Sequence, residues 1–148
     1  MDLTAHCFPA ESLIALAQAS AAINSTLELD VVLDQIARSA AAVMQAEASS
    51  VLTFDRRHNK LIFAAAVGEQ GSALMGKEFD ADLGIAGHVL KRGKAENILD
   101  VSQSSEFFRG IDEQVRFHTR GLMAAPMVYQ SEVIGVIEVL NRRGGGQF

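Results

Sequence analysis

The side chains that could carry chemistry in this 148-residue chain are few and widely spaced. A single cysteine, Cys7, rules out an intramolecular disulfide and any reaction that needs a thiol pair. The histidines His88 and His118 have no second ligand at a metal-binding spacing. No H-E-x-x-H pair, phosphate-binding glycine loop or G-x-S-x-G turn is present. These observations predict no catalytic residues, no metal and no cofactor, and therefore a chain that binds rather than reacts.

Composition and charge exclude further classes of function. The net charge is -5 and there is no dense run of Lys and Arg, which disfavours binding to nucleic acid or to an anionic membrane surface. The longest apolar run, residues 61–67, is far shorter than the roughly 20 residues of a membrane-spanning helix. The N-terminus has no basic and apolar signal-peptide pattern. With one cysteine, these features predict a cytoplasmic location.

The elements that must position any binding residues begin with helices. Residues 11–24 and 32–44 carry apolar residues at helical intervals, and the polar residues 24–26 separate the two stretches. Asp30 stands where a helix start favours a capping carboxylate. The sequence therefore predicts two helices in this region.

The rest of the chain predicts an antiparallel sheet. Its elements are a hairpin of residues 49–54 and 60–67, a short helix from residue 84, an irregular segment 100–119, and a hairpin of residues 122–129 and 133–140. Both strands of the last hairpin are almost wholly apolar, so both faces of the sheet should be covered. The order of elements predicts an α+β fold with a sheet between helical layers.

Four segments of the C-terminal half carry sharp motifs: G-I-A-G-H-V at residues 84–89, N-I-L-D at 97–100, a Thr-Arg to proline segment in 119–127, and E-V-I-G-V-I-E-V-L-N at 132–141. Together they resemble the GAF domain family, and most closely the regulatory GAF domains of cyclic-nucleotide phosphodiesterases and bacterial adenylate cyclases. Residues 84–89 resemble the family's G-I-A-G-x-V helix start, and residues 97–100 its N-I-x-D strand end. Residues 119–127 resemble its segment from Thr-Arg to proline, and residues 132–141 its E-V-I-G-V-x-x-x-x-N strand. The resemblance implies a GAF (PAS-like) fold, a central antiparallel β-sheet flanked by helices, over residues 11–148, after an N-terminal tail of residues 1–10.

The last residues resemble the family only in part. Family members continue from the asparagine through a glycine-containing turn to a phenylalanine and an acidic pair that opens a final helix. Residues 141–148 follow this track as far as Phe148. The resemblance therefore implies that the final C-terminal helix is missing and that the sequence is part of a longer signalling protein with a C-terminal output domain.

The resemblance also implies where a ligand would lie. In nucleotide-binding relatives it lies across the sheet, under the short helix and the irregular segment. The matching positions here are Ser50, Ala66, Val67, Ile85, Ala86, Asp112 and Thr119. Ala66 and Val67 replace an aromatic–acidic pair of those relatives, which removes about 1–3 kcal/mol of base stacking and predicts a drier pocket, a different ligand or none. Ile85 could equally be a core residue, and Asp112 and Thr119 could simply hold their loop.

Two functions remain open at this point. The chain could be a sensor for a small molecule, such as cAMP, cGMP or another metabolite, that relays its state through terminal helices to the output domain. It could instead be a ligand-free module that forms a homodimer through its first helices. Enzymatic or pigment-binding relatives of this family use cysteines inside the domain, and residues 100–119 contain none. No enzyme activity is therefore predicted.

Overall fold

The structure, a computed structural model, describes residues 10–148, with the side chains of residues 22–27 left undescribed. The predicted tail of residues 1–10, which includes Cys7, lies outside the described residues except for Ala10, where the first helix begins. The chain divides into two compact units, residues 1–32 and 33–148. The sheet and the pocket described below belong to the second unit.

One helix, α1 (Ala10–Met44), stands where the sequence predicts two. The predicted break at residues 24–26 and the cap at Asp30 are therefore wrong. The interval contains no glycine or proline, and Asn, Ser and Thr each lower helix stability by only a few tenths of a kcal/mol to roughly 0.7 kcal/mol. Starting a new helix is unfavourable, so continuing through weak helix formers is preferred.

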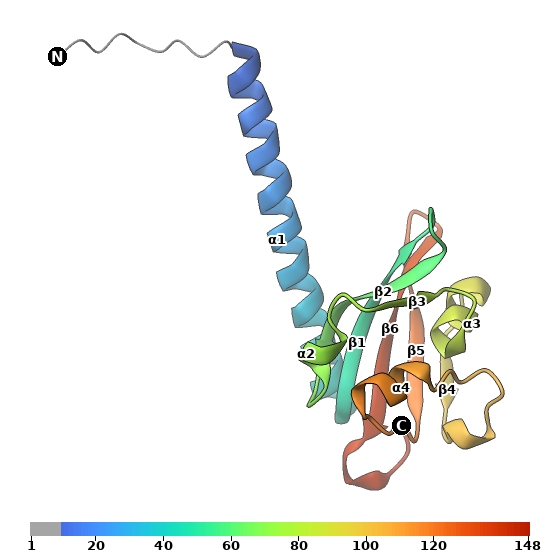
Figure 1. Cartoon of the computed structure of the whole chain (residues 1–148). Coiled ribbons are helices and arrows are strands. Elements are labelled where there is room, and N and C mark those ends of the chain that lie inside the picture. The colour runs from blue at the N-terminus through green and yellow to red at the C-terminus, as the bar shows by residue number, and fades with distance from the viewer. Residues whose placement is uncertain (1–9) are drawn as a thin grey trace. The chain divides into compact units, whose positions relative to one another are not determined.

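The sheet confirms the α+β prediction. It has six antiparallel strands in the order β3-β2-β1-β6-β5-β4, so both predicted hairpins form (Figure 1). The strands are β1 (Ala46–Asp55), β2 (Lys60–Val67), β3 (Glu78–Asp80), β4 (Glu96–Ile98), β5 (Leu122–Tyr129) and β6 (Glu132–Arg142). The β5–β6 turn at Gln130 and Ser131 has positive φ at both residues, as a two-residue hairpin turn of type I′ requires.

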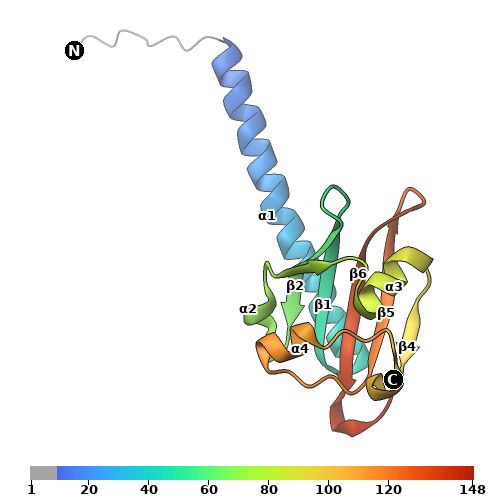
Figure 2. The same ribbon diagram turned by 45° about the vertical axis from the view of Figure 1, so that its right-hand side comes forward.

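The two faces of the sheet are packed differently. Successive residues of a strand point to opposite faces, and on β1 Val51 packs with Leu33 and Ala37 of α1, whereas Leu52 belongs to the larger core on the other face. That larger core includes Ile85, Ala86, Val89 and Leu90 of α3 (Gly84–Arg92). Figure 2 shows α3 and α4 (Gly110–Val115) over this same face of the sheet.

The glycines of the α3 motif have distinct physical roles. Gly84 has a φ of 74°, a backbone conformation that residues with a side chain rarely adopt. Gly87 packs so closely on the preceding loop that a Cβ atom there would lie 2.5 Å from the carbonyl oxygen of Ala81. Both glycines of G-I-A-G are thus set by backbone geometry, and they hold α3 close to the core.

Short helices lie in two stretches of the chain where the sequence predicts no helix. The glycine-rich region after β2 contains α2 (Gly71–Leu74), and residues 100–119 contain η1 (Val101–Gln103) and α4. The last element of the chain is η2 (Arg143–Gly145). In the described part of the chain, no helix is both long and apolar enough to cross a membrane.

The close approach of Gly87 to Ala81 predicts a stability change. Alanine is normally the better helix former, but Gly87→Ala would force its methyl group against the Ala81 carbonyl. We expect the free energy of unfolding to fall by about 1–3 kcal/mol in urea denaturation. Gly146→Ala is the control, because a Cβ there meets only Arg142 Cδ at 3.7 Å. A Gly87→Ala protein as stable as the wild type would contradict this packing.

Candidate functional site

A pocket of about 80 Å³ lies between the sheet and the segments α2, α3 and α4. Apolar residues make up most of its wall, as is usual for small-molecule sites. An engineered cavity of about 150 Å³ is large enough to bind benzene. The pocket in this form therefore has room for a compact group and would have to widen for a molecule the size of a nucleotide.

The structure brings most of the predicted ligand-binding positions to this pocket. Its lining includes Ser50, Val67, Ile85, Ala86, Asp112 and Thr119. Ala66 is not part of the lining, and its carbonyl group packs instead against Gly71 of α2. Ile85 and Ala86 also belong to the core under α3. Ligand contact by any of these residues stays a prediction.

Asp112 and Thr119 are bonded to each other. The Thr119 backbone N–H and its Oγ1 hydroxyl each donate to the Asp112 carboxylate, at 2.9 Å and 2.9 Å. Thr119 is only 1% exposed, and a buried hydroxyl group needs a hydrogen-bond partner, which Asp112 provides. The pair closes the loop that runs from α4 to β5. It thereby holds one wall of the pocket and places a carboxylate in its lining.

Glu138 is a charged residue of the pocket lining that was not among the ligand-binding residues predicted from the sequence. It lies on β6 directly opposite Ser50, whose hydroxyl donates to Glu138 Oε2 across 3.4 Å. Burial raises the pKa of the Glu138 carboxyl to about 7; the Ser50 hydrogen bond partly offsets this increase, and the charge of Asp112 adds to it. A lone acidic residue within the apolar run 133–140 was the available signal.

The charged side chains that line the pocket are all acidic. Asp112 and Glu138 are the charged residues in its lining, and no Lys, Arg or His of the described chain joins them there. Neither carboxylate forms an ion pair with a described residue. The pocket is therefore an apolar cavity with an acidic wall, and its favourable electrostatic partner is a positive charge.

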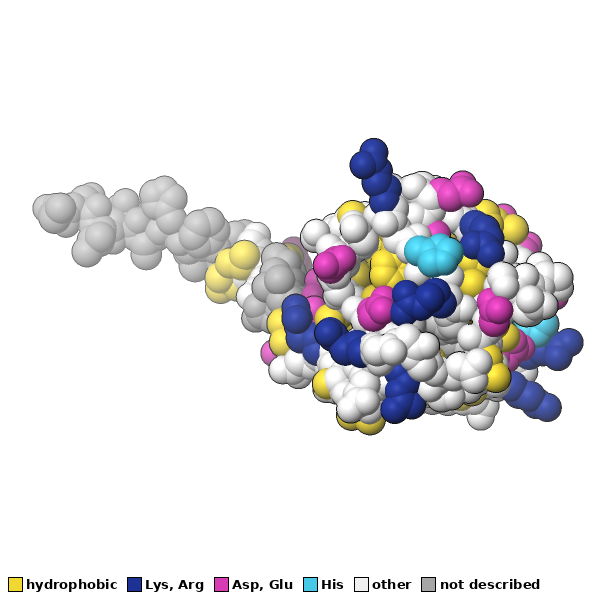
Figure 3. Space-filling view, turned by 90° about the horizontal axis from the view of Figure 1, so that it is seen from below, with side chains coloured by type: hydrophobic (Ala, Val, Ile, Leu, Met, Phe, Trp, Pro, Cys, Tyr) yellow, Lys and Arg dark blue, Asp and Glu magenta, His cyan; other side chains and the backbone are white. Residues whose placement is uncertain are grey.

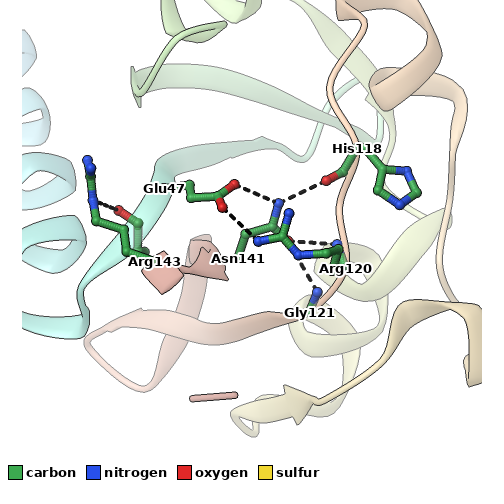
Figure 4. A network of polar contacts seen from close by, with 7 residues as sticks. Glu47, His118, Arg120, Gly121, Asn141 and Arg143 are labelled. Atoms are coloured by element: carbon green, nitrogen blue, oxygen red, sulfur yellow. Dashed lines mark hydrogen bonds and ion pairs between the residues drawn. The ribbon is translucent and has the colours of Figure 1, made fainter. Parts of the chain in front are cut away.

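A buried amide holds the far end of the same loop. Asn141 Oδ1 accepts from the backbone N–H groups of Arg120 (2.6 Å) and Gly121 (3.3 Å). Its Nδ2 donates to the carbonyl oxygen of His118 (2.8 Å) and to Glu47 Oε2 (3.1 Å). Figure 4 shows these groups converging on Asn141. The network joins the loop, the end of β6 and the start of β1.

An ion pair supports this network from the surface. Arg120 Nη2 lies 2.6 Å from Glu47 Oε1 and, by this hydrogen bond, lowers the pKa of the Glu47 carboxyl below its ordinary value. Arg143 also contributes at this end, where its Nε donates to the Ala46 carbonyl oxygen at 3.2 Å. The strand end that follows α1 is thus fixed to the loop that walls the pocket.

A second hollow of about 400 Å³ lies beside this network, lined by residues that include Arg109, Arg120 and Arg142. Arg120 pairs with Glu47, Arg142 Nη1 donates to the Gln147 carbonyl oxygen at 3.0 Å, and the Arg109 guanidinium lies over the Phe107 ring, 5.3 Å from its centroid. The face seen from below in Figure 3 mixes Lys and Arg with Asp and Glu rather than gathering one sign of charge. The acidic, apolar pocket is therefore the candidate site.

Comparison with known proteins identifies the kind of domain. The family model for the GAF domain matches residues 28–148. The chain is 23% identical over 131 residues to the probable 3',5'-cyclic phosphodiesterase pde-5 of Caenorhabditis elegans, a match that covers 82% of the chain and 18% of that protein. It is 37% identical over 70 residues to the alpha' subunit of the cone cGMP-specific 3',5'-cyclic phosphodiesterase of Mus musculus, covering 47% of the chain and 8% of that protein. The chain thus spans less than a fifth of the length of either relative.

Solved structures share the fold. The GAF domain of a phosphoenolpyruvate-protein phosphotransferase from Coxiella burnetii superposes with a TM-score of 0.73 at 20% identity, covering 92% of this chain and 80% of that one. The corresponding domain from Acinetobacter gives a TM-score of 0.69 at 21% identity, covering 95% and 82%. At these identities the similarity establishes the architecture, which agrees with the predicted α+β fold.

The Asn141 network predicts a large loss of stability when its amide is removed. Asn141 has a φ of 54°, so Asn141→Gly keeps a favourable backbone and removes only the side-chain hydrogen bonds. We expect the free energy of unfolding to fall by about 2–4 kcal/mol, because several buried groups lose their partner. Urea denaturation measures this. Asn59→Gly is the matched control: Asn59 has a φ of 51°, and its side-chain hydrogen bonds, to Asp80 and Asp82, are exposed to water. We expect this change to lower stability by about 0.5 kcal/mol or less. Equal losses in the two variants would contradict the assigned role.

The raised pKa of Glu138 predicts how stability depends on pH. The pKa of a glutamate is near 4.5 in the unfolded chain, whereas that of Glu138 in the fold is about 7, so the folded state binds this proton more tightly. The stability that this proton contributes is fully present below pH 4.5 and is lost as pH rises to about 7. Between pH 5 and pH 8 we expect the wild type to lose about 1–3 kcal/mol more than Glu138→Gln. Glu132→Gln, on the exposed end of β6, should keep the wild-type dependence. If the free energy of unfolding of Glu138→Gln fell with pH as steeply as that of the wild type, another group would be responsible for the pH dependence.

Proposed function

This chain belongs to the GAF domain family, and we propose on that premise that it is a regulatory, sensory domain whose pocket binds a small molecule. The observation that carries the proposal is the pocket itself: a mostly apolar cavity under α3 and α4 in which a few polar groups converge. Those groups are Ser50, Asp112, Thr119 and Glu138. We propose a binding domain of the cytoplasm, without catalysis of its own.

A contact route from the pocket supports a relay role. Thr119 lies in the pocket wall, and the next residue, Arg120, pairs with Glu47 near the start of β1. Met44, the last residue of α1, precedes Glu47 by a few positions. A ligand that moves the 100–119 segment would therefore act on the end of α1. We propose that α1 and the chain after β6 pass this change to a neighbouring output domain.

The size of such a response depends on differential affinity. A ligand shifts a two-state equilibrium only as far as it binds one state better than the other, and a swing from 1:99 to 99:1 requires about 5.5 kcal/mol. A compact ligand in a pocket of about 80 Å³ supplies only part of that. The domain is therefore suited to graded regulation, or to a dimer in which two sites act together.

A second candidate function rests on α1. Its described residues include large apolar side chains that are exposed, with Val43 the most exposed at 80%. The others are Leu13, Ile14, Leu16, Leu29, Val31, Val32 and Ile36. Exposed apolar surface of this kind marks protein interaction sites. On this proposal, two copies of the chain associate through α1, and the pocket carries no ligand.

Binding of cAMP or cGMP is the more specific form of the sensor proposal. It is supported by the names of the phosphodiesterase relatives, one of which is cGMP-specific. The lining of the pocket argues against it, because a cyclic phosphate would lie near Asp112 and Glu138 with no described cation to offset them. We therefore place other metabolites ahead of cyclic nucleotides.

Thermal melting with a panel of millimolar metabolites, cAMP and cGMP included, tests the sensor proposal. A ligand at 100 times its Kd adds about 2.7 kcal/mol, which corresponds to a rise in Tm of roughly 5–10 °C for a domain of this size. Ala48→Leu, which fills the pocket lining, should abolish the shift. Ala73→Leu, the same change at an exposed site on α2, should preserve it.

Two outcomes would overturn the sensor proposal. A wild-type Tm that no compound raises would favour the ligand-free homodimer. A shift that persists in Ala48→Leu would place the bound molecule outside this pocket.

A further inference from the structure

We propose that the pocket selects small organic cations, in which an ammonium or amidinium group is carried on a compact apolar body, and that it excludes anions. The inference rests on the proposed function, since it names the ligand class of the same site. It starts from the arrangement of charges, hydrogen-bond acceptors and aromatic rings around the cavity.

The first argument is charge. Asp112 enters the lining from α4 and Glu138 from β6, and every other described residue of the lining is uncharged. A carboxylate in an apolar cavity interacts more strongly with another charge than it would in water. An anionic ligand would be repelled by both groups, whereas a cation would be attracted by both. The pocket thus has the sign of a cation site.

The second argument is unused acceptor capacity. The carboxylate of Glu138 accepts one side-chain hydrogen bond, from Ser50 Oγ at 3.4 Å, which is long for a bond between oxygens. An ionised carboxylate can accept about four hydrogen bonds, so Glu138 has acceptor positions to spare. Asp112 is instead held in place by Thr119 and contributes mainly its charge. The Ser49, Ser50 and Thr119 hydroxyls of the lining already donate within the protein. An ammonium or amidinium group would supply the donors that Glu138 can still accept.

The third argument is the aromatic wall. The ring of Phe79 lies between those of Phe63 and Phe108, with centroid distances of 5.9 Å and 6.2 Å. All three residues line the pocket, as do Phe107 and Phe117. Aromatic faces attract cations, and the rings also favour an apolar ligand body. The volume of about 80 Å³ limits that body to a compact one.

The protonation state of Glu138 gives the inference a direction that can be measured. Burial raises the pKa of this carboxyl to about 7, and the titratable group that faces it from the rest of the lining is Asp112. A cation binds the ionised form of Glu138, so binding should tighten as pH rises, by about tenfold between pH 6 and pH 8. A neutral ligand that accepts a hydrogen bond from protonated Glu138 would show the opposite trend.

The test uses two series of matched probes: n-propylamine, n-propanol and propionate, and n-butylamine, n-butanol and butyrate. Each is titrated into the ¹⁵N-labelled full chain at pH 6 and pH 8, and Kd is taken from the shifts of pocket amides in NMR spectra. The variant is Glu138→Gln, which keeps size and removes charge. Its control is Glu132→Gln on the same strand, where the side chain is 63% exposed and pairs with Arg56.

We expect the amines to bind at least about tenfold more tightly than the alcohols at pH 8, and the carboxylates not to bind. Glu138→Gln should weaken amine binding about tenfold and remove its pH dependence, whereas Glu132→Gln should leave both unchanged. The folded spectrum of each variant shows whether the domain is intact. The pH dependence of the wild type tests the role of Glu138 independently of any variant.

The possible failures are distinguishable. Alcohols or carboxylates that bind as well as the amines, or amine binding that weakens as pH rises, would overturn the cation inference and leave the small-molecule pocket standing. Binding of a metabolite from the thermal panel, with no binding by either amine, would also overturn the cation inference and leave the small-molecule pocket standing. If no probe and no panel compound binds, both proposals are wrong.

Discussion

The buried side-chain amide of Asn141 is the interaction on which the rest of the site depends. It satisfies two backbone N–H groups and one carbonyl group of the loop at residues 118–121, and it reaches Glu47 at the start of β1. A loop packed against a sheet has backbone polar groups that need partners when water is excluded. One asparagine at a strand end supplies three of those bonds and a fourth to the Glu47 side chain. The covering segment, and with it the pocket wall, is thus held in a defined position.

The two carboxylates of the pocket have the same chemistry and different hydrogen-bond partners. Asp112 accepts both the N–H and the hydroxyl of Thr119, so its carboxylate serves to close a loop. Glu138 has one long hydrogen bond, and burial moves its pKa to about 7. Perturbed ionisable groups with spare hydrogen-bonding capacity are typical of functional sites. Asp112 therefore holds the loop that lines the pocket, whereas Glu138 has acceptor positions available to a ligand.

The fold and the pocket lining follow separate constraints. The architecture is shared with GAF domains at about 20% identity because it depends on the glycine contacts of α3 and on apolar alternation in the strands, which many sequences satisfy. The lining is less constrained by packing, and here it combines apolar residues such as Val67 with the carboxylates of Asp112 and Glu138. A common scaffold can therefore receive chemically different molecules, and ligand identity has to be argued from the site itself.

The sequence by itself determined the α+β class, both hairpins and the helix that begins at Gly84, which follow from local periodicity and from motifs whose glycines have a steric reason. The resemblance to the GAF family predicted six of the residues that line the pocket. The pairing of Asp112 with Thr119 and the exposure of Glu138 to the cavity were decided only by the tertiary structure. For Glu138 the physical reason is distance along the chain, because it meets Ser50 across 88 positions. The desolvation that raises the Glu138 pKa comes from segments whose packing no local pattern records.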